Sequence, residues 1–302
     1  MSSDSPTNNP QFSTIEAVFA SQVQLKHELR SSLNAIIGYS EMLWQDTQDS
    51  GQNELHLGFK RLHKAGQRLL NTTNTVLEAS RLATGTLELS LDSLVAKLRH
   101  HLRTPIDEFI AVCEQLLKRS EELGREGNVT DLRKIRVEGD KLIALLDGQG
   151  QGTKPNASLA GLANPNTGFR DAATAIRQSK TESEAAKAER GTILVVDDSD
   201  SNRDILSRQL HREGHTVFAA TNGNMALQMM KSRKFDLVLL GIMLPEVNGY
   251  QVLEKIKATS GWNAIPVIMI SALDDLNTVV KCLEMGAEDY LAKPFNSVVL
   301  KA

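Results

Sequence analysis

Two adjacent carboxylates follow a short apolar run in the last third of the chain. The run Thr192–Val196 consists of β-branched and apolar residues, which predicts a buried strand, and Asp197 and Asp198 come directly after it. Ligands of open α/β sheets bind outside the carboxyl ends of the parallel strands. Carboxylate oxygens are the hard ligands that Mg²⁺ prefers. The pair therefore predicts a polar site suited to Mg²⁺ at one edge of a sheet.

Further apolar runs would bring other residues to the same edge. Helical stretches separate these runs, and this alternation predicts a doubly wound α/β domain with a parallel sheet. The runs and the residues associated with them are 235–240 with Gly241, 266–270 with Ser271, and 290–295 with Tyr290 and Lys293.

Two histidines in the first half of the chain lie in repeated segments. The segment 27–33 aligns with 100–106, and the offset of 73 residues between His27 and His100 also aligns 60–62 with 133–135 and 66–70 with 139–143. An offset that holds over two helices and a turn indicates an internal repeat. Each copy is then one helical hairpin, and two hairpins make an all-α four-helix bundle.

The apolar residues of both copies recur at steps of three and four, which is typical of bundle helices. Both His27 and His100 fall between leucines of these stripes, so we expect both side chains to point into solvent. The pattern leaves open whether the hairpins pair within one chain or across a homodimer. The stripes comprise Ile15, Val18, Leu25, Leu29, Leu33, Ile36 and Leu43, then Leu55, Phe59, Leu62, Leu69 and Val76, then Leu87, Leu91, Leu94, Leu98, Leu102, Ile106 and Phe109, and finally Leu132, Ile135, Leu142 and Leu145.

Composition limits the class of protein. The chain has 34 Lys and Arg against 37 Asp and Glu, a net charge of −3, which provides no basic footprint for nucleic acid. No apolar run reaches the ~18 residues that a membrane span needs, and the N-terminus lacks the pattern of a secretory signal. The two cysteines, Cys113 and Cys282, exclude a disulfide framework and a Cys-based zinc site. We therefore expect a cytoplasmic protein that binds neither nucleic acid nor membranes.

Composition also divides the chain into segments. A Gly- and Pro-rich stretch separates the helical region from the α/β region. The expected segments are a disordered start at 1–10, the two hairpins at 11–85 and 86–147, a linker at 148–169, a connecting helix at 170–190, and the α/β domain at 191–302. Since few residues follow Phe295, we expect a truncated fifth helix and an output domain beyond residue 302.

The first repeat, over 27–41, resembles the dimerisation and phosphotransfer hairpin of sensor histidine kinases, and the second shares its 102–105 core. The resemblance implies that His27 or His100 could accept a phosphoryl group, with an adjacent acid taking the proton.

Each copy departs from the pattern of that family. The first has Ser32 where the family has proline, and the second has His101 where the family has an acid. Nothing at 148–190 resembles the ATP-binding domain of a histidine kinase, so we do not expect the chain to phosphorylate itself by that route.

The C-terminal region, 191–302, resembles a response-regulator receiver domain, which implies a flavodoxin-like fold with a five-stranded parallel sheet. Where that family has its phosphoacceptor aspartate, this chain has Gly241, which offers neither a nucleophile nor a side-chain ligand. We therefore expect a pseudo-receiver that is not phosphorylated and binds no cofactor, or Mg²⁺ only weakly through Asp198. The other positions that the resemblance singles out are the acidic pair Asp197 and Asp198 and the switch residues Ser271, Tyr290 and Lys293.

Three functions agree with the sequence. The first is a regulatory or scaffolding protein of the two-component type, whose bundle and pseudo-receiver control an output domain through dimer geometry and without phosphate. The second is a phosphorelay intermediate that accepts phosphate on His100 or His27. The third is the regulatory fragment of a nucleotide cyclase or a Ser/Thr phosphatase, because 270–273 and 293–296 resemble receivers fused to such enzymes. Expected partners are a second copy through the bundle and a histidine kinase, receiver or output-domain protein.

Overall fold

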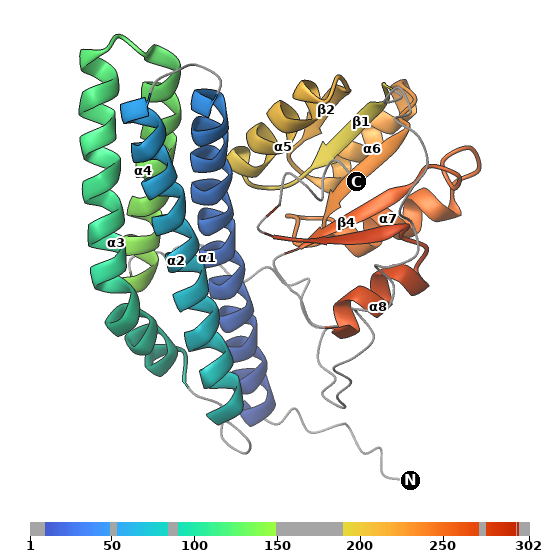
Figure 1. The fold of residues 1–302 in the computed structure, drawn as a ribbon. Coiled ribbons are helices and arrows are strands. Elements are labelled where there is room, and N and C mark those ends of the chain that lie inside the picture. The colour runs from blue at the N-terminus through green and yellow to red at the C-terminus, as the bar shows by residue number, and fades with distance from the viewer. Residues whose placement is uncertain are drawn as a thin grey trace, which may run out of the picture.

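The computed structural model describes residues 10–48, 53–83, 90–148, 190–271, 276–293 and 295. In these residues a bundle of long helices stands beside an α/β domain (Figure 1). The predicted disordered start, linker, connecting helix and truncated last helix lie outside the described residues, apart from Pro10, Gly148 and Arg190 at their borders.

Four helices form the bundle. Each packs against two neighbours, in the pairs α1–α2, α2–α3, α3–α4 and α1–α4, so the ring is closed within one chain. The two hairpins therefore pair within one chain in this structure, a point that the sequence pattern left open. The helices are α1 Pro10–Gln48, α2 Asn53–Ala83, α3 Leu91–Glu122 and α4 Glu126–Leu146.

The predicted stripes pack into the core of the bundle where the structure describes their side chains, with Leu91 and Leu145 only partly buried. The side chains of Ile15, Val18 and Leu87 lie outside the described part of the chain. Leu29 and Leu98 from the two repeats are fully buried, as are Phe59, Leu62 and Phe109 between them. Burying each such side chain contributes about 1.5–3 kcal/mol, so this seam supplies much of the bundle's stability. The prediction of a four-helix bundle is confirmed.

The α/β domain is a five-stranded parallel sheet in the order β2-β1-β3-β4-β5. This is the doubly wound order that the sequence predicted. Its elements are β1 Thr192–Val196, α5 Asp200–Arg212, β2 Thr216–Ala220, α6 Gly223–Ser232, β3 Leu237–Gly241, α7 Gly249–Ala258, β4 Val267–Ser271, α8 Leu276–Glu284 and β5 Asp289–Ala292.

Helix α5 connects the two parts of the molecule. Its N-terminus is capped by Ser199, whose hydroxyl accepts from the Asn202 backbone amide. Leu206 packs into the core beneath one face of the sheet, whereas the neighbouring Ile205 belongs to the core of the bundle. One helix therefore buries apolar side chains on two sides, which fixes the α/β domain against the bundle (Figure 1).

Candidate functional site

The acidic site lies at the carboxyl end of β1. The Asp197 carboxylate accepts a hydrogen bond from Lys293 Nζ at 2.6 Å, and both side chains are almost completely buried. It also accepts from the Ser199 backbone amide at 3.0 Å and from Asn202 Nδ2 at 3.1 Å. The Lys293 backbone amide in turn donates to the Ser271 carbonyl at 2.8 Å. Three of the residues singled out in the sequence thus meet here.

The pKa values of the two adjacent acids are shifted in opposite directions. Burial opposes ionisation of Asp197, but the Lys293 ammonium and the hydrogen bonds outweigh burial and lower its pKa. Dense surroundings and the negative charge of Asp197 raise the pKa of Asp198 to about 6, although solvent still reaches this side chain. Asp197 is therefore a fixed anion, and Asp198 is the group that titrates.

Gly241 is the last residue of β3 and faces this site. A Cβ built here would lie 3.1 Å from the Val196 carbonyl oxygen and 3.4 Å from Leu244 Cδ2, so a side chain fits only if these neighbours shift by a few tenths of an ångström. Because Gly241 has no side chain, the site lacks a carboxylate at this position.

The remaining donors do not fit a Mg²⁺ site. Asp197 is engaged by an ammonium group and an amide, Gly241 supplies no carboxylate, and only Asp198 offers a free carboxylate side chain. Mg²⁺ demands near-octahedral coordination by oxygen. Among the described residues, no group of three or more His, Cys, Asp or Glu could hold a metal.

Ser271 and Tyr290 lie on adjacent strands. Ser271 ends β4 and is buried, and Tyr290 in β5 is half-buried against the core that includes Met269 and Cys282. These positions agree with their predicted places in the sheet.

The predicted exposure of His27 is wrong. His27 is only 6% exposed, because the α/β domain covers the side of α1 that faces away from the bundle seam. Burial, and after it the charge of Lys293, lower the pKa of His27 from 6.5 to about 4, although Asp197 partly opposes both effects. The imidazole thus lies within the electrostatic reach of the acidic site.

Two polar residues of α1 bind the edge of that site directly. Asn34 Nδ2 donates to Asn202 Oδ1 at 2.7 Å, and Asn34 Oδ1 accepts from the Phe295 backbone amide at 2.8 Å. Asn202 Nδ2 also donates to Ser31 Oγ at 3.2 Å. Because Asn202 also binds Asp197, one amide side chain links α1 to the acidic pair.

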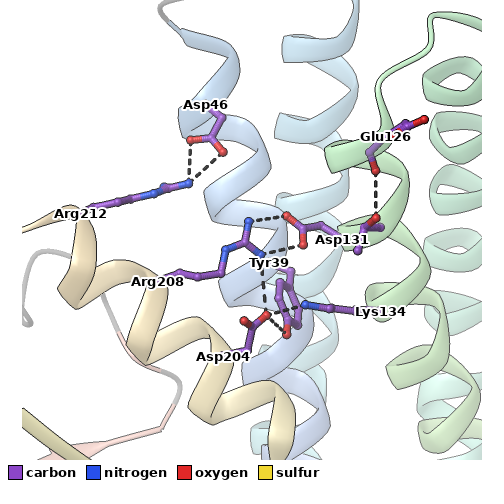
Figure 2. Close-up of polar contacts among 9 residues, drawn as sticks. Tyr39, Asp46, Glu126, Asp131, Lys134, Asp204, Arg208 and Arg212 are labelled. Carbon is purple, nitrogen blue, oxygen red and sulfur yellow. Dashed lines mark hydrogen bonds and ion pairs between the residues drawn. The ribbon is translucent and has the colours of Figure 1, made fainter. Parts of the chain in front are cut away.

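Charged residues extend this contact along α5, as Figure 2 shows. Arg208 forms a bidentate pair with Asp131 of α4, at 2.7 and 2.8 Å. Asp204 accepts from Lys134 at 2.6 Å and from the Tyr39 hydroxyl at 2.7 Å. We call the bundle surface that the α/β domain contacts the α1–α4 face; its residues are His27, Ser31, Asn34, Gly38, Tyr39, Asp46, Asp131, Lys134 and Glu138.

The ends of α5 add further polar contacts, and its centre packs tightly. Arg212 pairs with Asp46 at 2.9 Å, and Ser201 donates to Glu138 at 2.8 Å. A Cβ on Gly38 would lie 2.9 Å from two carbons of Ile205, so glycine permits the close approach of α1 and α5. We call this arrangement the docked state.

His100 has a different environment from His27, although the repeat makes them equivalent. Its side chain is exposed on α3, as predicted, and its ring lies 5.1 Å from that of His101. The structure therefore does not bring the two histidines to one site.

Family comparisons agree with both parts of this geometry. Residues 24–85 match the family described as "His Kinase A (phospho-acceptor) domain", and residues 193–302 match the "Response regulator receiver domain". The chain joins a HisKA domain to a receiver domain. This combination indicates two-component signalling.

The receiver has similar counterparts in several curated proteins. It is 40% identical over 110 residues to the probable transcriptional regulator ycf27 of Cyanidium caldarium, which covers 36% of this chain and 43% of that protein. It is 36% identical over 111 residues to the transcriptional regulatory protein AfsQ1 of Streptomyces coelicolor, covering 37% and 48%. A cyclic di-GMP phosphodiesterase of Thermotoga maritima is 36% identical over 110 residues, covering 36% and 29%. The chain thus spans less than half of the length of these relatives.

Solved structures of receivers are also similar. The chemotaxis protein CheY4 of Vibrio cholerae is 26% identical, covers 37% of this chain and 94% of that chain, and gives a TM-score of 0.36. The receiver of a sensor histidine kinase from Pseudomonas aeruginosa is 28% identical, covers 37% and 93%, and gives a TM-score of 0.35; it has a magnesium ion coordinated in its active site cleft.

The residues that dock the receiver could not be recognised from the sequence. Asn34, Tyr39, Asp131 and Arg208 carry no motif of their own. The available signal was Gly38 in the middle of a helix, where glycine costs about 1 kcal/mol relative to alanine and therefore often marks a close approach.

Docking of the receiver is expected to weaken as the pH falls from about 6.5 to about 4. His27 is neutral in the docked state because its pKa is about 4 there, and its ordinary value is 6.5. Between these two pH values the released state binds more protons than the docked state, so acid favours release. At pH 4 the free energy of docking is less favourable by about 3 kcal/mol.

Energy transfer between a dye on the bundle and a dye on the receiver measures the docked fraction at each pH. Protonation of Asp198, with a pKa of about 6, acts on the same measurement, so the informative quantity is the difference between the wild type and His27→Gln. Identical pH profiles for the two proteins would contradict the burial of His27.

Proposed function

We propose that this protein is a regulatory component of two-component-type signalling whose receiver acts as an intramolecular ligand of its own HisKA bundle, without a phosphoryl group. The observation that carries the proposal is that His27 of the bundle is buried beneath the receiver's acidic site. In that receiver, glycine (Gly241) occupies the position of the phosphoacceptor. The acidic edge of the receiver, where a phosphoryl group would be exchanged, instead binds the bundle.

The chemistry of the covered site supports a binding role. Phosphoryl transfer to a receiver needs a nucleophilic carboxylate, and Gly241 has none. The ammonium of Lys293 is tied to Asp197 at 2.6 Å, and Asn202 is shared between Asp197 and α1. Of these groups, Asn202 contacts the bundle directly, through Ser31 and Asn34 of α1.

In this proposal the signal is the balance between the docked and released states. A partner can shift that balance only by the difference between its affinities for the two states. A partner that binds the α1–α4 face, or the side of α5 that packs on it, favours release because each surface covers the other in the docked state.

The closed bundle also limits how two copies of the chain could form a homodimer. One chain closes the four-helix ring, so a homodimer would use another surface or exchange hairpins between chains. In this proposal the segments 11–85 and 86–147 are the two hairpins, and 191–302 is the pseudo-receiver.

The proposal is tested by asking whether phosphoryl donors label the protein or release the receiver from the bundle. The full chain is incubated with acetyl phosphate and Mg²⁺, or with a panel of radiolabelled histidine kinases, and labelling is measured together with the rate at which diethyl pyrocarbonate modifies His27. We expect no label and an unchanged, slow modification of His27. Ser271→Ala should behave like the wild type. Label on an aspartate, or release of the receiver by a phosphoryl donor, would refute the proposal.

A phosphorelay role at His100 is the second candidate, because this imidazole is exposed and follows the same repeat. In the same experiment this role predicts a label that is stable in base, labile in acid, and lost in His100→Ala.

A further inference from the structure

Two histidines of α2 face two hydroxyl groups of α1. Ser40 Oγ lies 3.2 Å from His63 Nδ1, and Thr47 Oγ1 lies 3.3 Å from His56 Nδ1. On each helix the two residues are seven apart, a spacing that returns to the same side of a helix. The two pairs therefore follow one another along the α1–α2 contact, and we call them the hydroxyl–imidazole pairs.

The half-buried Trp44 of α1 lies between these pairs. Its ring stacks on that of His63, with the ring centroids 5.7 Å apart, and its Nε1 donates to His56 Nε2 at 3.3 Å. Because this side chain contacts both imidazoles, its fluorescence reports on both.

The hydrogen bonds of His56 admit only one form of the ring. An indole N–H can only donate, so His56 Nε2 accepts from Trp44 and carries no proton. His56 Nδ1 then carries the proton and donates to Thr47, whose hydroxyl donates in turn to the Leu43 and Trp44 carbonyls at 3.1 and 2.9 Å. A second proton, on Nε2, would set two N–H groups against each other.

The hydrogen bonds of His63 select the same neutral form. The Ser40 hydroxyl donates to the Ile37 carbonyl at 3.0 Å, so it accepts from His63 Nδ1. His63 Nε2 accepts from Gln67 Nε2 at 2.9 Å. Burial lowers the pKa of His63 below its ordinary value of 6.5, although the charge of Glu41 and the Ile37 carbonyl partly oppose this effect.

Charged groups of three helices lie near the two imidazoles. Glu41 of α1 favours protonation of His63, whereas Lys60 of α2 places its Nζ 5.6 Å from the centroid of the Trp44 ring. From α3, Arg119 pairs with Glu54 at the start of α2, at 3.0 Å.

The second hairpin of the repeat lacks both imidazoles. The offset of 73 residues places Val129 and Arg136 where the first hairpin has its two histidines. Ser120, the counterpart of Thr47, is fully buried, and its hydroxyl has no hydrogen-bond partner within the described residues. Sensitivity to protons through such pairs therefore belongs to the α1–α2 contact and not to α3–α4.

The same turns of α1 hold the receiver on their other side. Tyr39 and Asp46, which directly precede the two hydroxyl residues, bind α5 through Asp204 and Arg212. In the turn of Tyr39, Gly38 allows α5 to approach closely. A movement of α1 away from α2 at these turns would displace the residues that bind α5.

We propose that the hydroxyl–imidazole pairs are a proton-binding site that regulates docking, because protonation of His56 and His63 opens the α1–α2 contact and thereby releases the receiver. Each neutral ring is bound on both nitrogens in the docked state. The contribution of the closed contact is therefore complete above pH 6.5 and is lost as the pH falls through the lowered pKa of His63. This inference rests on the balance between docked and released states in the proposed function.

A starting chain isolates these histidines from the other titrating groups. It is the full chain with His27→Gln and Asp198→Asn, which remove the titrations described above, and Trp262→Phe, which leaves Trp44 as its only tryptophan. Energy transfer between dyes on bundle and receiver gives the ratio of docked to released chains, and the unlabelled chain gives the Trp44 emission. From about pH 7.5 to about pH 5 we expect this ratio to fall about tenfold, with the emission changing at the same midpoint.

Matched variants of the starting chain locate the effect. His56→Gln/His63→Gln keeps hydrogen-bonding side chains that do not titrate and should flatten both curves. His101→Gln removes an exposed imidazole from α3 and should leave both curves unchanged. Docking that weakens equally with and without the two histidines, or a constant docked ratio while Trp44 emission titrates, would overturn the inference. Neither result would affect the proposed function, which phosphoryl donors test separately.

A second measurement keeps the test valid if these substitutions disturb docking. Long-range ¹H–¹⁵N spectra of imidazole rings in the unaltered full chain distinguish a proton on Nδ1 from one on Nε2, and at about pH 7.5 we expect the Nδ1–H form for both His56 and His63. Coupling is reciprocal, so release of the receiver by Asp131→Arg should raise the titration midpoint of His63 by about one pH unit, the counterpart of a tenfold effect. An Nε2–H form of either ring, or equal midpoints in the docked and released chains, would overturn the inference.

Discussion

Asp131→Arg is expected to release the receiver from the bundle. The substitution leaves Arg208 without its bidentate partner and places a second cation against it. Removing one member of a buried pair costs about 3–5 kcal/mol. Since Arg208 is 34% exposed while Asp131 is 7% exposed, we take the lower end, about 3 kcal/mol, which is roughly a hundredfold change in the docked population.

The release can be followed at His27. Its modification by diethyl pyrocarbonate should accelerate by one to two orders of magnitude, and small-angle X-ray scattering should report a larger radius of gyration. Asp140→Arg is the matched control, because Asp140 lies on the same helix but is exposed and pairs with Arg136. The double variant Asp131→Arg/Arg208→Asp should restore protection. A wild-type rate at His27 in Asp131→Arg would show that this pair does not hold the docked state.

Gly241→Asp is expected to turn the receiver from inert to phosphorylatable, most strongly when the receiver is also released. The new carboxylate would join Asp197, Asp198 and Lys293 at the carboxyl edge of the sheet and provide the missing nucleophile. A Cβ fits at this position after small shifts of Val196 and Leu244. In the docked state α1 covers the site, so labelling should be slow there.

Mass spectrometry after treatment with acetyl phosphate and Mg²⁺ gives the labelled fraction. We expect none in the wild type, a slow increase in Gly241→Asp, and nearly complete labelling in Gly241→Asp/Asp131→Arg. Gly241→Asn has the same size without the nucleophile and should stay unlabelled. An unlabelled double variant would mean that Gly241 is not the acceptor position, and equal rates in docked and released chains would mean that α1 does not shield it.

Much of the fold could be predicted because its signals are local. The strand Thr192–Val196 lies where its apolar run predicts it, and the acids that follow it belong to the same short segment. The bundle stripes depend only on helical period, so Leu29 and Leu102 were assigned to the core correctly. Gly241 was also found from the sequence, since it follows directly from the end of a strand.

What covers the outer side of α1 was decided only by the tertiary structure. The sequence placed His27 and His100 in equivalent positions and predicted the same exposure for both. Docking of α5 then buried one and left the other in solvent. Helical period identifies which side of a helix faces its own bundle, but it contains no information about a second domain packing on the opposite side.

The docking contacts illustrate the physical reason. Asn34 meets Asn202, and Tyr39 meets Asp204, across sequence separations of 168 and 165 residues. Each of these polar residues is, in sequence, an ordinary member of a helix surface. The sequence by itself therefore determined the two folds, the acidic edge and the absent acceptor. Only the packing of α5 against α1 and α4 decided that the acidic edge would close over His27, because that outcome depends on the shape and charge of two surfaces together.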